Sequence, residues 1–257
     1  MPGLSNVRRL EAVGFRSWPA TNTHYDGAWA IRLTAGHPAK RLNSVNPLDP
    51  ADHSDLERRI ERAGERFKAF GRPLVFRQTP LAPPDLENML DARGWRRFDE
   101  SIVMVADLAD VPLEGAIDHL PIKDTGRWVD NIITMNNEET SLKPGLSELI
   151  GSVHASVGLF YTENSDHQPC SAAMCVQDND LAGLFEVVTH PDYRKQGKGL
   201  EIVKASLRWA KNQGAKRAWL QVVAANIPAV NLYHSLGFGE VYRYAYRQAP
   251  EVQQISK

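Results

Sequence analysis

Cysteine, charge of one sign and long apolar runs are all scarce in this sequence, and each scarcity argues against a class of protein. Only two cysteines occur among 257 residues, Cys170 and Cys175. Five residues apart on an expected strand, they project to opposite faces, so we expect neither a disulfide nor a shared metal site. Acidic and basic side chains nearly cancel, with a formal net charge of −1. This balance argues against binding to nucleic acid or to a membrane surface through bulk charge.

No apolar run approaches the roughly 20 residues that a membrane-spanning helix needs. The N-terminus has no apolar block of the kind that signal peptides carry. Together with the few cysteines, these absences predict a cytoplasmic protein with no membrane partner. No metal-ligand spacing occurs, so no metal is expected. The length suits one large domain or two small ones.

The most informative stretch runs from Val187 to Leu200 and reads VVTHPDYRKQGKGL. Residues 181–188 are apolar apart from Glu186 and predict a largely buried strand. Apolar residues recur at helical spacing from the end of the stretch onward. Gly197 and Gly199 therefore fall where a strand gives way to a helix N-terminus, whose free N–H groups and partial positive charge suit a pyrophosphate. A surface turn with solvated basic side chains is the alternative that these residues alone leave open.

Spacing excludes two common nucleotide-binding loops. Lys198 is followed by Gly199, which does not fit the Walker A pattern. Ile202 stands where the dinucleotide fingerprint needs its third glycine. Arg194-x-x-Gly197-x-Gly199, in contrast, resembles the acyl-CoA pyrophosphate loop of the GCN5-related N-acetyltransferases.

A second pattern resembles the same family. It reads Asn226-x-x-Ala229-x-x-Leu232-Tyr233-x-x-x-Gly237-Phe238 and follows the strand after the pyrophosphate helix. The two motifs in this order are more specific than the loop alone, and by them residues 124–247 are identified as a member of the family. The resemblance implies an acetyl-CoA-dependent N-acetyltransferase. Its acceptor would be a primary amine of a small molecule, an amino acid or a peptide N-terminus.

The resemblance also implies which residues bind the donor. Backbone groups of Val187, Val188 and Thr189 would bond the pantetheine arm like an added strand. The arm would lie in a gap between this strand and the strand at residues 218–223. Asn226 would bond the arm or the turn between strand and helix. The pyrophosphate side would comprise Arg194, Lys195, Gln196, Gly197, Lys198, Gly199 and Leu200.

Two residues are candidates for catalysis. Tyr233 matches the family's general acid, and a phenol with an ordinary pKa near 10 suits protonation of a leaving thiolate. Without the motif, such a tyrosine is usually core packing. Glu186 is the candidate base, because a carboxylate in an apolar strand is costly unless paired, solvated or functional, and desolvation raises its pKa. A solvent-side or ion-paired glutamate is the alternative. His190 is a second candidate base, but its place before Pro191 favours a structural or phosphate-side role.

The order of expected elements predicts a mixed α/β fold. The resemblance implies a mostly antiparallel central sheet flanked by helices, in two related modules. The thin pattern at 110–123 places the boundary, with a degenerate acetyltransferase-like domain at residues 1–110 and an acyl-CoA-binding catalytic domain at residues 111–257. Helix, glycine, aromatic and strand at Leu90–Trp95 echo Tyr233–Phe238, which suggests duplication. The alternative is coincidence, since such helix ends are common.

The first half has no Arg-x-x-Gly-x-Gly loop, so it is expected to have lost cofactor binding. Its nearest region, Arg41–Pro47, contains no glycine and reads as an irregular or edge-strand segment. Arg41, Asn43, Ser44 and Asn46 form a polar cluster that we expect to face outward. The cluster lines the acceptor site or is an ordinary turn. Two other functions stay open, a non-catalytic acyl-CoA-binding module and a transferase with another acyl donor. Formation of a homodimer is open as well.

Overall fold

The computed structural model describes residues 3–250. A polar tail expected at 249–257 lies outside the described residues from 251 onward. The helices are α1 (Leu4–Ser17), α2 (Leu56–Ala69), α3 (Pro84–Ala92), α4 (Thr125–Asn136), α5 (Lys143–Gly151), α6 (Lys198–Asn212) and α7 (Ile227–Ser235). The strands are β1 (Asn22–Asp26), β2 (Trp29–Leu33), β3 (Ser44–Pro47), β4 (Val75–Gln78), β5 (Arg96–Asp107), β6 (Ser156–Glu163), β7 (Pro169–Asp178), β8 (Leu181–Thr189), β9 (Arg217–Val223) and β10 (Gly239–Gln248).

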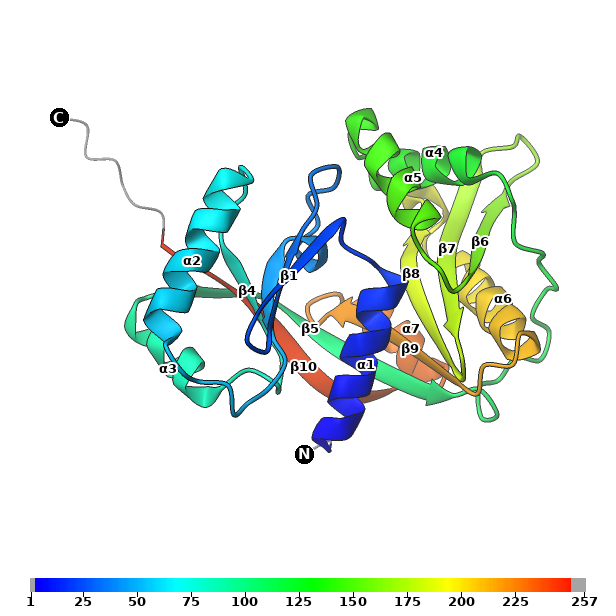
Figure 1. The fold of residues 1–257 in the computed structure, drawn as a ribbon. Coiled ribbons are helices and arrows are strands. Elements are labelled where there is room, and N and C mark those ends of the chain that lie inside the picture. Colours follow the sequence, from blue (N-terminus) through cyan, green and yellow to red (C-terminus); the bar gives the residue numbers. More distant parts are fainter. Residues whose placement is uncertain (1–2, 251–257) are drawn as a thin grey trace.

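One ten-stranded sheet runs through the molecule in the order β1-β2-β3-β4-β10-β5-β9-β8-β7-β6 (Figure 1). Only the pairs β3–β4 and β8–β9 are parallel, so the described sheet is mostly antiparallel, as predicted. From either edge of the sheet inward, the strand pairs follow the same order, which is antiparallel, antiparallel, parallel and antiparallel. Each half is completed by a strand from the other part of the chain, because β10 pairs with β4 and β5 pairs with β9. The division at residue 110 stays a prediction, and the sheet shows an exchange of strands across it.

Helices cover both faces of the second half of the sheet. On one face, α1, α4 and α5 bury an apolar cluster that includes Trp128, Phe185 and Trp219. On the other, α6 and α7 pack over a cluster that contains Leu184 and Leu220. A third cluster lies beneath α2 and α3 in the first half. Leu184 and Phe185 thus face opposite sides of β8, as neighbouring strand residues should.

Helix α1 ties the two halves together (Figure 1). Its Glu11 is buried and accepts hydrogen bonds from both terminal nitrogens of Arg77 on β4 and, at 2.5 Å, from the hydroxyl of Tyr242 on β10. A buried ion pair is tolerated when hydrogen bonds satisfy its charges. Arg16, at the other end of the helix, pairs with Asp178 on β7 at 2.7 Å.

Two predictions for the first half are wrong. Strand β3 is not at an edge, because the hairpin of β1 and β2 covers it. The polar cluster does not face outward either, since Asn43, Ser44 and Asn46 are all buried. The side-chain amide of Asn46 donates to the carbonyls of Ala30 and Ser44, and so satisfies backbone groups within the sheet. Of the four residues, only Arg41 is partly exposed.

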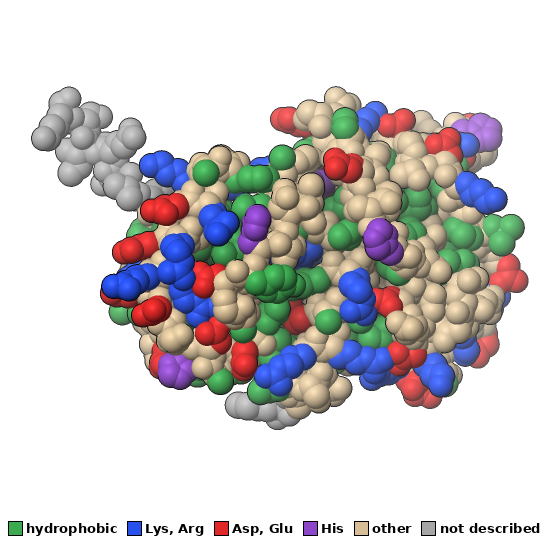
Figure 2. All heavy atoms as spheres, viewed as in Figure 1, with side chains coloured by type: hydrophobic (Ala, Val, Ile, Leu, Met, Phe, Trp, Pro, Cys, Tyr) green, Lys and Arg blue, Asp and Glu red, His purple; other side chains and the backbone are tan. Residues whose placement is uncertain are grey.

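The surface carries mixed charge. Figure 2 shows basic and acidic side chains interspersed, most densely over α2, on the face that it presents. Both cysteines are free thiols, buried in β7. Within residues 3–250, no helix is long and apolar enough to cross a membrane.

Candidate active site

A bulge in β8 shapes the site. The register between β7 and β8 shifts between the pairs Ala172–Val188 and Met174–Phe185. Glu186 lies in the shift and has a φ of 47°, in the left-handed region. Such a bulge bends a strand and redirects its side chains, and non-glycine residues at positive φ gather at functional sites.

The bulge reverses the side-chain alternation. Leu184 and Val187 both contact the apolar cluster beneath α6, although residues three apart in a regular strand face opposite sides. Phe185 and Val188 both contact the cluster on the α1 face. Glu186 is half-buried on the α1 side, where Arg41 and Glu138 act on its charge.

Beyond the bulge, β8 separates from β9. The parallel pairing of these strands ends at Leu184 and Leu220. Val188 and Thr189 still pair with β7 on their other side. The β9-facing backbone groups from residue 187 to 189 are therefore outside the β8–β9 ladder, as an added extended ligand would require.

The expected anion cradle follows directly. A single 3-10 turn at Pro191–Tyr193 leads to Gly197, the N-cap of α6, with a φ of 79°. The first bond of the helix runs from the amide of Glu201 to the carbonyl of Gly197. The amides of the first turn, from residue 198 to 200, precede that bond and are free for a ligand. Lys195 also has a positive φ, 59°, and alternating left-handed residues favour an anion-binding concavity.

Gly199 is needed where the cradle meets β8. A Cβ atom on this residue would lie 3.0 Å from Oγ1 of Thr189. That separation is tighter than ordinary van der Waals contact, so the glycine lets the helix N-terminus approach the end of the strand. The close approach of α6 to the end of β8 thus depends on a missing side chain.

Several side chains of the cradle bond to neighbouring groups of the protein. Arg194 is exposed, and its Nε donates to the carbonyl of Thr189 at 3.4 Å. The side-chain amide Nε2 of Gln196 donates to the carbonyl of Asp192 at 2.8 Å. Lys198 pairs with Glu201 at 3.0 Å, and this hydrogen bond raises the pKa of the lysine.

Tyr233 lies on α7 beside the second cluster. Its ring is buried and meets Phe238 edge to face at a centroid distance of 5.8 Å. Burial raises the pKa of the phenol to about 12. Within residues 3–250, its hydroxyl forms no hydrogen bond to another protein group. The raised pKa keeps the phenol protonated near neutral pH, and its hydroxyl can donate a hydrogen bond to a ligand.

Two polar residues near the site have structural roles. The side chain of Asn226 caps α7 by accepting from the amide of Ala229 at 3.3 Å. This is the turn contact named among its expected roles. Nδ1 of His190 accepts from the amide of Asp192 at 3.3 Å. The imidazole thus supports the turn before α6, which matches its expected structural role.

Glu186 has the electrostatics of a base. Desolvation is the main cause that raises the pKa of its carboxyl, the positive charge of Arg41 opposes this effect, and the negative charge of Glu138 adds to it. A carboxylate with a raised pKa is better matched to an ammonium group near neutral pH.

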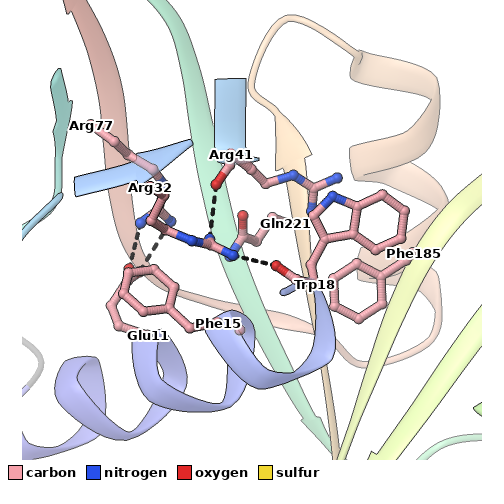
Figure 3. A pocket seen from close by; sticks show the side chains of 9 residues that line it. Glu11, Phe15, Trp18, Arg32, Arg41, Arg77, Phe185 and Gln221 are labelled. Carbon is pink, nitrogen blue, oxygen red and sulfur yellow. Dashed lines mark hydrogen bonds and ion pairs between the residues drawn. The ribbon is translucent and has the colours of Figure 1, made fainter. Parts of the chain in front are cut away.

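Sequence reasoning missed a pocket beside Glu186 (Figure 3). It lies where α1 and the strands of the first half meet Phe185 on β8 and Gln221 on β9. Of its lining residues, Arg41 alone was singled out from the sequence. Its other lining residues are Glu11, Gly14, Phe15, Trp18, Arg32 and Arg77. They come from α1 and the residue that follows it, from β2 and from β4, so no local pattern joins the whole set.

The comparison with protein families decides the assignment. The chain matches the family described as "Probable histone acetyltransferase Rv0428c C-terminal" over residues 4–247. The chain belongs to the GCN5-related N-acetyltransferases. This acetyltransferase is therefore an acyltransferase by family, and the match extends over both halves of the chain.

Relatives agree with this assignment. An uncharacterized N-acetyltransferase of Bacillus subtilis, YobR, is 24% identical over 250 residues, which cover 95% of this acetyltransferase and 99% of the relative. The ribosomal protein bS18-alanine N-acetyltransferase of Escherichia coli K12 is 39% identical over 61 residues, 24% of this chain and 41% of that protein.

Solved structures share the fold. A GCN5-related N-acetyltransferase from Kribbella flavida has a TM-score of 0.73 at 17% identity, with 99% of this chain and 98% of that chain covered. A tandem acetyltransferase from the clavulanic acid biosynthesis pathway has a TM-score of 0.64 at 14% identity, with 95% and 89% covered.

Proposed function

We propose that this acetyltransferase transfers the acetyl group of acetyl-CoA directly to a primary amine. The β8–α6 junction supports binding of the donor, with β8 edge groups for the pantetheine arm and first-turn amides for the pyrophosphate. Side chains in this cradle, including those of Arg194, Lys195 and Gln196, add contacts around the phosphates.

Glu186 and Tyr233 carry the proton transfers. The carboxylate of Glu186 takes a proton from the acceptor ammonium, directly or through water. The neutral amine attacks the thioester carbonyl, a backbone amide near Val188 polarises the carbonyl oxygen, and a C–N bond replaces the C–S bond. Tyr233 donates its proton to the departing thiolate, and the second proton that the nitrogen loses on forming the amide restores the phenol. Burial that raises the phenol pKa also raises that of a thiolate in the same environment, so donor and acceptor shift together.

The buried Tyr233, whose hydroxyl is not used by the protein, carries this proposal. The ring of Tyr233 is buried while its hydroxyl keeps some access to solvent, so the phenol can meet a bound donor. The side chain of Tyr233, on α7, belongs to the same apolar cluster that Val187 of β8 contacts. The general acid is thereby associated with the strand expected to hold the donor.

The experiment measures free-thiol release from acetyl-CoA across a panel of amines, amino acids and peptides. Tyr233→Phe should lower kcat about 100-fold or more, the usual size of a general acid–base contribution, while CoA affinity stays the same. Tyr25→Phe is the matched control, since Tyr25 is 68% exposed on β1 and should leave the rate unchanged. An unchanged rate in Tyr233→Phe would remove this residue as the acid. CoA binding with no turnover on any amine would refute the transferase function.

A further inference from the structure

The pocket of Figure 3 joins the first half of the chain to the proposed catalytic residues. Arg41 and Trp18 lie together with Phe185 on one side of it, and Glu11 lies with Arg32 and Arg77 on the other. Phe185 is the immediate neighbour of Glu186 in β8. The pocket therefore adjoins the residue proposed to deprotonate the amine.

Positive charge in this pocket exceeds negative charge. Glu11 is the only acidic residue in its lining, and that carboxylate is already bonded by Arg77 and Tyr242. Arg32 is buried against neutral partners, the carbonyls of Trp18 and of Arg41, the latter at 2.8 Å. Desolvation, with the charge of Arg77 as the next cause, lowers the pKa of Arg32 to about 9. Within residues 3–250, Arg32 thus has no carboxylate bonded to it, and the more distant charge of Glu11 acts in its favour.

Two donors in the pocket have no acceptor. The Arg41 guanidinium stacks on the rings of Trp18 and Phe185, at 5.5 and 5.7 Å from their centroids. Within the described part of the chain, no carboxylate forms an ion pair with it. The indole Nε1 of Trp18 is also without a hydrogen-bond partner, although Trp18 is only 2% exposed. The Trp18 nitrogen shares this state with those of Trp29 and Trp219, whereas the partly exposed Arg41 guanidinium is open to a ligand with acceptor atoms.

We infer that the acceptor amine carries an anionic group, a carboxylate or a phosphate, which the partly exposed guanidinium of Arg41 binds at the mouth of this pocket. A planar guanidinium stacked on aromatic rings offers paired N–H donors to such oxygens. The buried Arg32 adds positive charge beneath it. The amine end would lie toward Glu186, whose charge Arg41 already influences. This inference rests on the proposed function and assigns acceptor recognition to the first half of the chain.

Matched amine pairs test the inference. The probes are glycine against glycinamide, L-phenylalanine against L-phenylalaninamide, and O-phosphoethanolamine against ethanolamine. Binding is measured by ligand-observed NMR with CoA present, which needs no turnover. At least one anionic member should bind about 10-fold or more tightly than its uncharged partner, the range of hydrogen bonds to charged groups. The two classes of anion show whether a carboxylate or a phosphate is preferred.

Variants of Arg41 decide whether the pocket causes that preference. Arg41→Gln should abolish it, and Arg41→Lys should retain part of it, because the charge remains without the paired donors. Arg96→Gln is the control, since Arg96 stacks on Phe98 at 4.6 Å outside the pocket and should keep the full preference. Urea unfolding of each variant verifies that the fold is intact.

Equal binding of both members in every pair, or an anion preference that survives in folded Arg41→Gln, would overturn the inference. Thiol release with the same probes separates it from the proposed function. Arg41-dependent binding without acetylation of any amine would refute the transferase function and leave the anion site standing. Acetylation of uncharged amines, unaffected by Arg41→Gln, would support the function and refute the anion site.

Discussion

The junction between β3 and α2 and the junction between β8 and α6 occupy matching places in the sheet, and of these two only the second has the features expected of a pyrophosphate site. The strand end and the helix N-cap have the same separation in sequence in both, at Pro47 and Asp55 and at Thr189 and Gly197. Both N-cap residues are left-handed, with φ values of 51° and 79°. The backbone course is thus similar, and the side chains make the difference.

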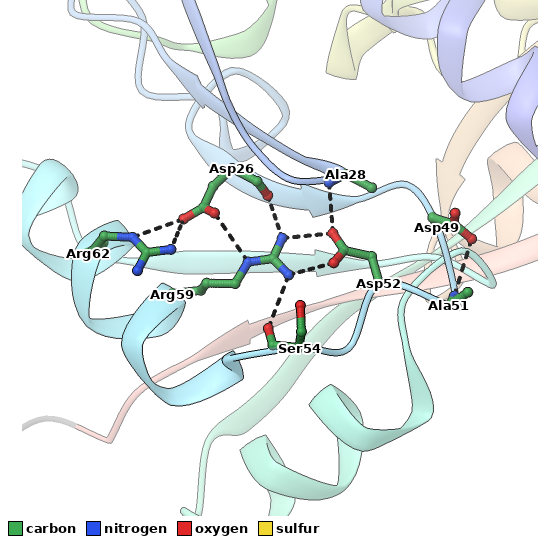
Figure 4. Close-up of polar contacts among 8 residues, drawn as sticks. All are labelled: Asp26, Ala28, Asp49, Ala51, Asp52, Ser54, Arg59 and Arg62. Atoms are coloured by element: carbon green, nitrogen blue, oxygen red, sulfur yellow. Dashed lines mark hydrogen bonds and ion pairs between the residues drawn. The ribbon is translucent and has the colours of Figure 1, made fainter.

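The first-half junction is filled by its own ion pairs (Figure 4). Arg59 of α2 is buried, binds both carboxylate oxygens of Asp52 at 2.8 Å and stacks over Trp29 at 4.0 Å. Asp55 places a further carboxylate at the N-terminus of the helix, where a phosphate would otherwise lie. An anion would be repelled here, whereas the glycine junction leaves its amides open.

The two helix ends that follow also match in geometry. The amide of Trp95 bonds the carbonyl of Leu90 at 3.0 Å, and the amide of Phe238 bonds that of Tyr233 at 3.0 Å. Leu90 therefore stands where the second half has Tyr233, and it offers no proton. The same backbone arrangement thus occurs twice, once with structural ion pairs and once with the groups proposed for acyl transfer.

Removal of the first-half ion pair should have the largest effect. Arg59→Ala should lower the free energy of unfolding by roughly 3–5 kcal/mol, because it leaves Asp52 and Asp26 without their buried cation. Urea unfolding measures the loss. Arg62→Ala, which removes the half-exposed partner of Asp26, should cost less than about 1 kcal/mol. Equal losses in the two variants would show that burial of the pair does not matter.

This contribution should depend on pH. The hydrogen bond from Arg59 lowers the pKa of Asp52 below its ordinary value. The stabilisation is therefore fully present above the ordinary pKa and is lost as the pH falls through the lowered one. The difference in free energy of unfolding between wild type and Arg59→Ala should become smaller in that acid range. A difference that grew there would contradict the assignment.

The bulge of β8 gives the next comparison. Ser44 stands three residues before the end of β3, as Glu186 stands three before the end of β8. Glu186→Gln should lower kcat/KM by about 100-fold. Because burial raises the pKa of Glu186, the wild-type rate should fall, as the pH drops, at a pH above that of an ordinary carboxyl. The variant should lose this limb of the pH profile, and an unchanged limb would assign the base elsewhere.

The smallest effect should come from a charge placed at the glycine junction. Gly197→Asp copies the N-cap of the first half and should weaken CoA binding about 10-fold, because a carboxylate cancels the positive end of α6. Isothermal titration with CoA measures this. Gly94→Asp is the control for backbone strain, since Gly94 has a φ of 69° at the end of α3. CoA affinity reduced equally in both variants would mean that general strain, not local charge, is responsible.

Sequence patterns predicted the features of the fold that depend on residues close together in the chain. The strand predicted at 181–188, the glycines at the helix N-terminus and the helix after them follow from polarity, spacing and residue type, and the family motifs then implied the donor. The bulge at Glu186 was not foreseeable, since its φ is set by pairing with β7. Strand β1 was missed because Asn22–Asp26 is polar and mostly exposed, without the alternation of a half-buried strand. The pocket at Arg41 and Trp18 depends on long-range packing.

The position of β10 has a consequence for how the protein is made. Ala245 pairs with Gln78, and Tyr244 pairs with Ser101, so the late strand joins two early ones. During synthesis, β4 and β5 emerge long before β10 and present unpaired edges until it arrives. Pairings over such separations form slowly. The first half therefore completes its sheet only after the residues of the second half have been synthesised, and a nascent chain is exposed to aggregation until then.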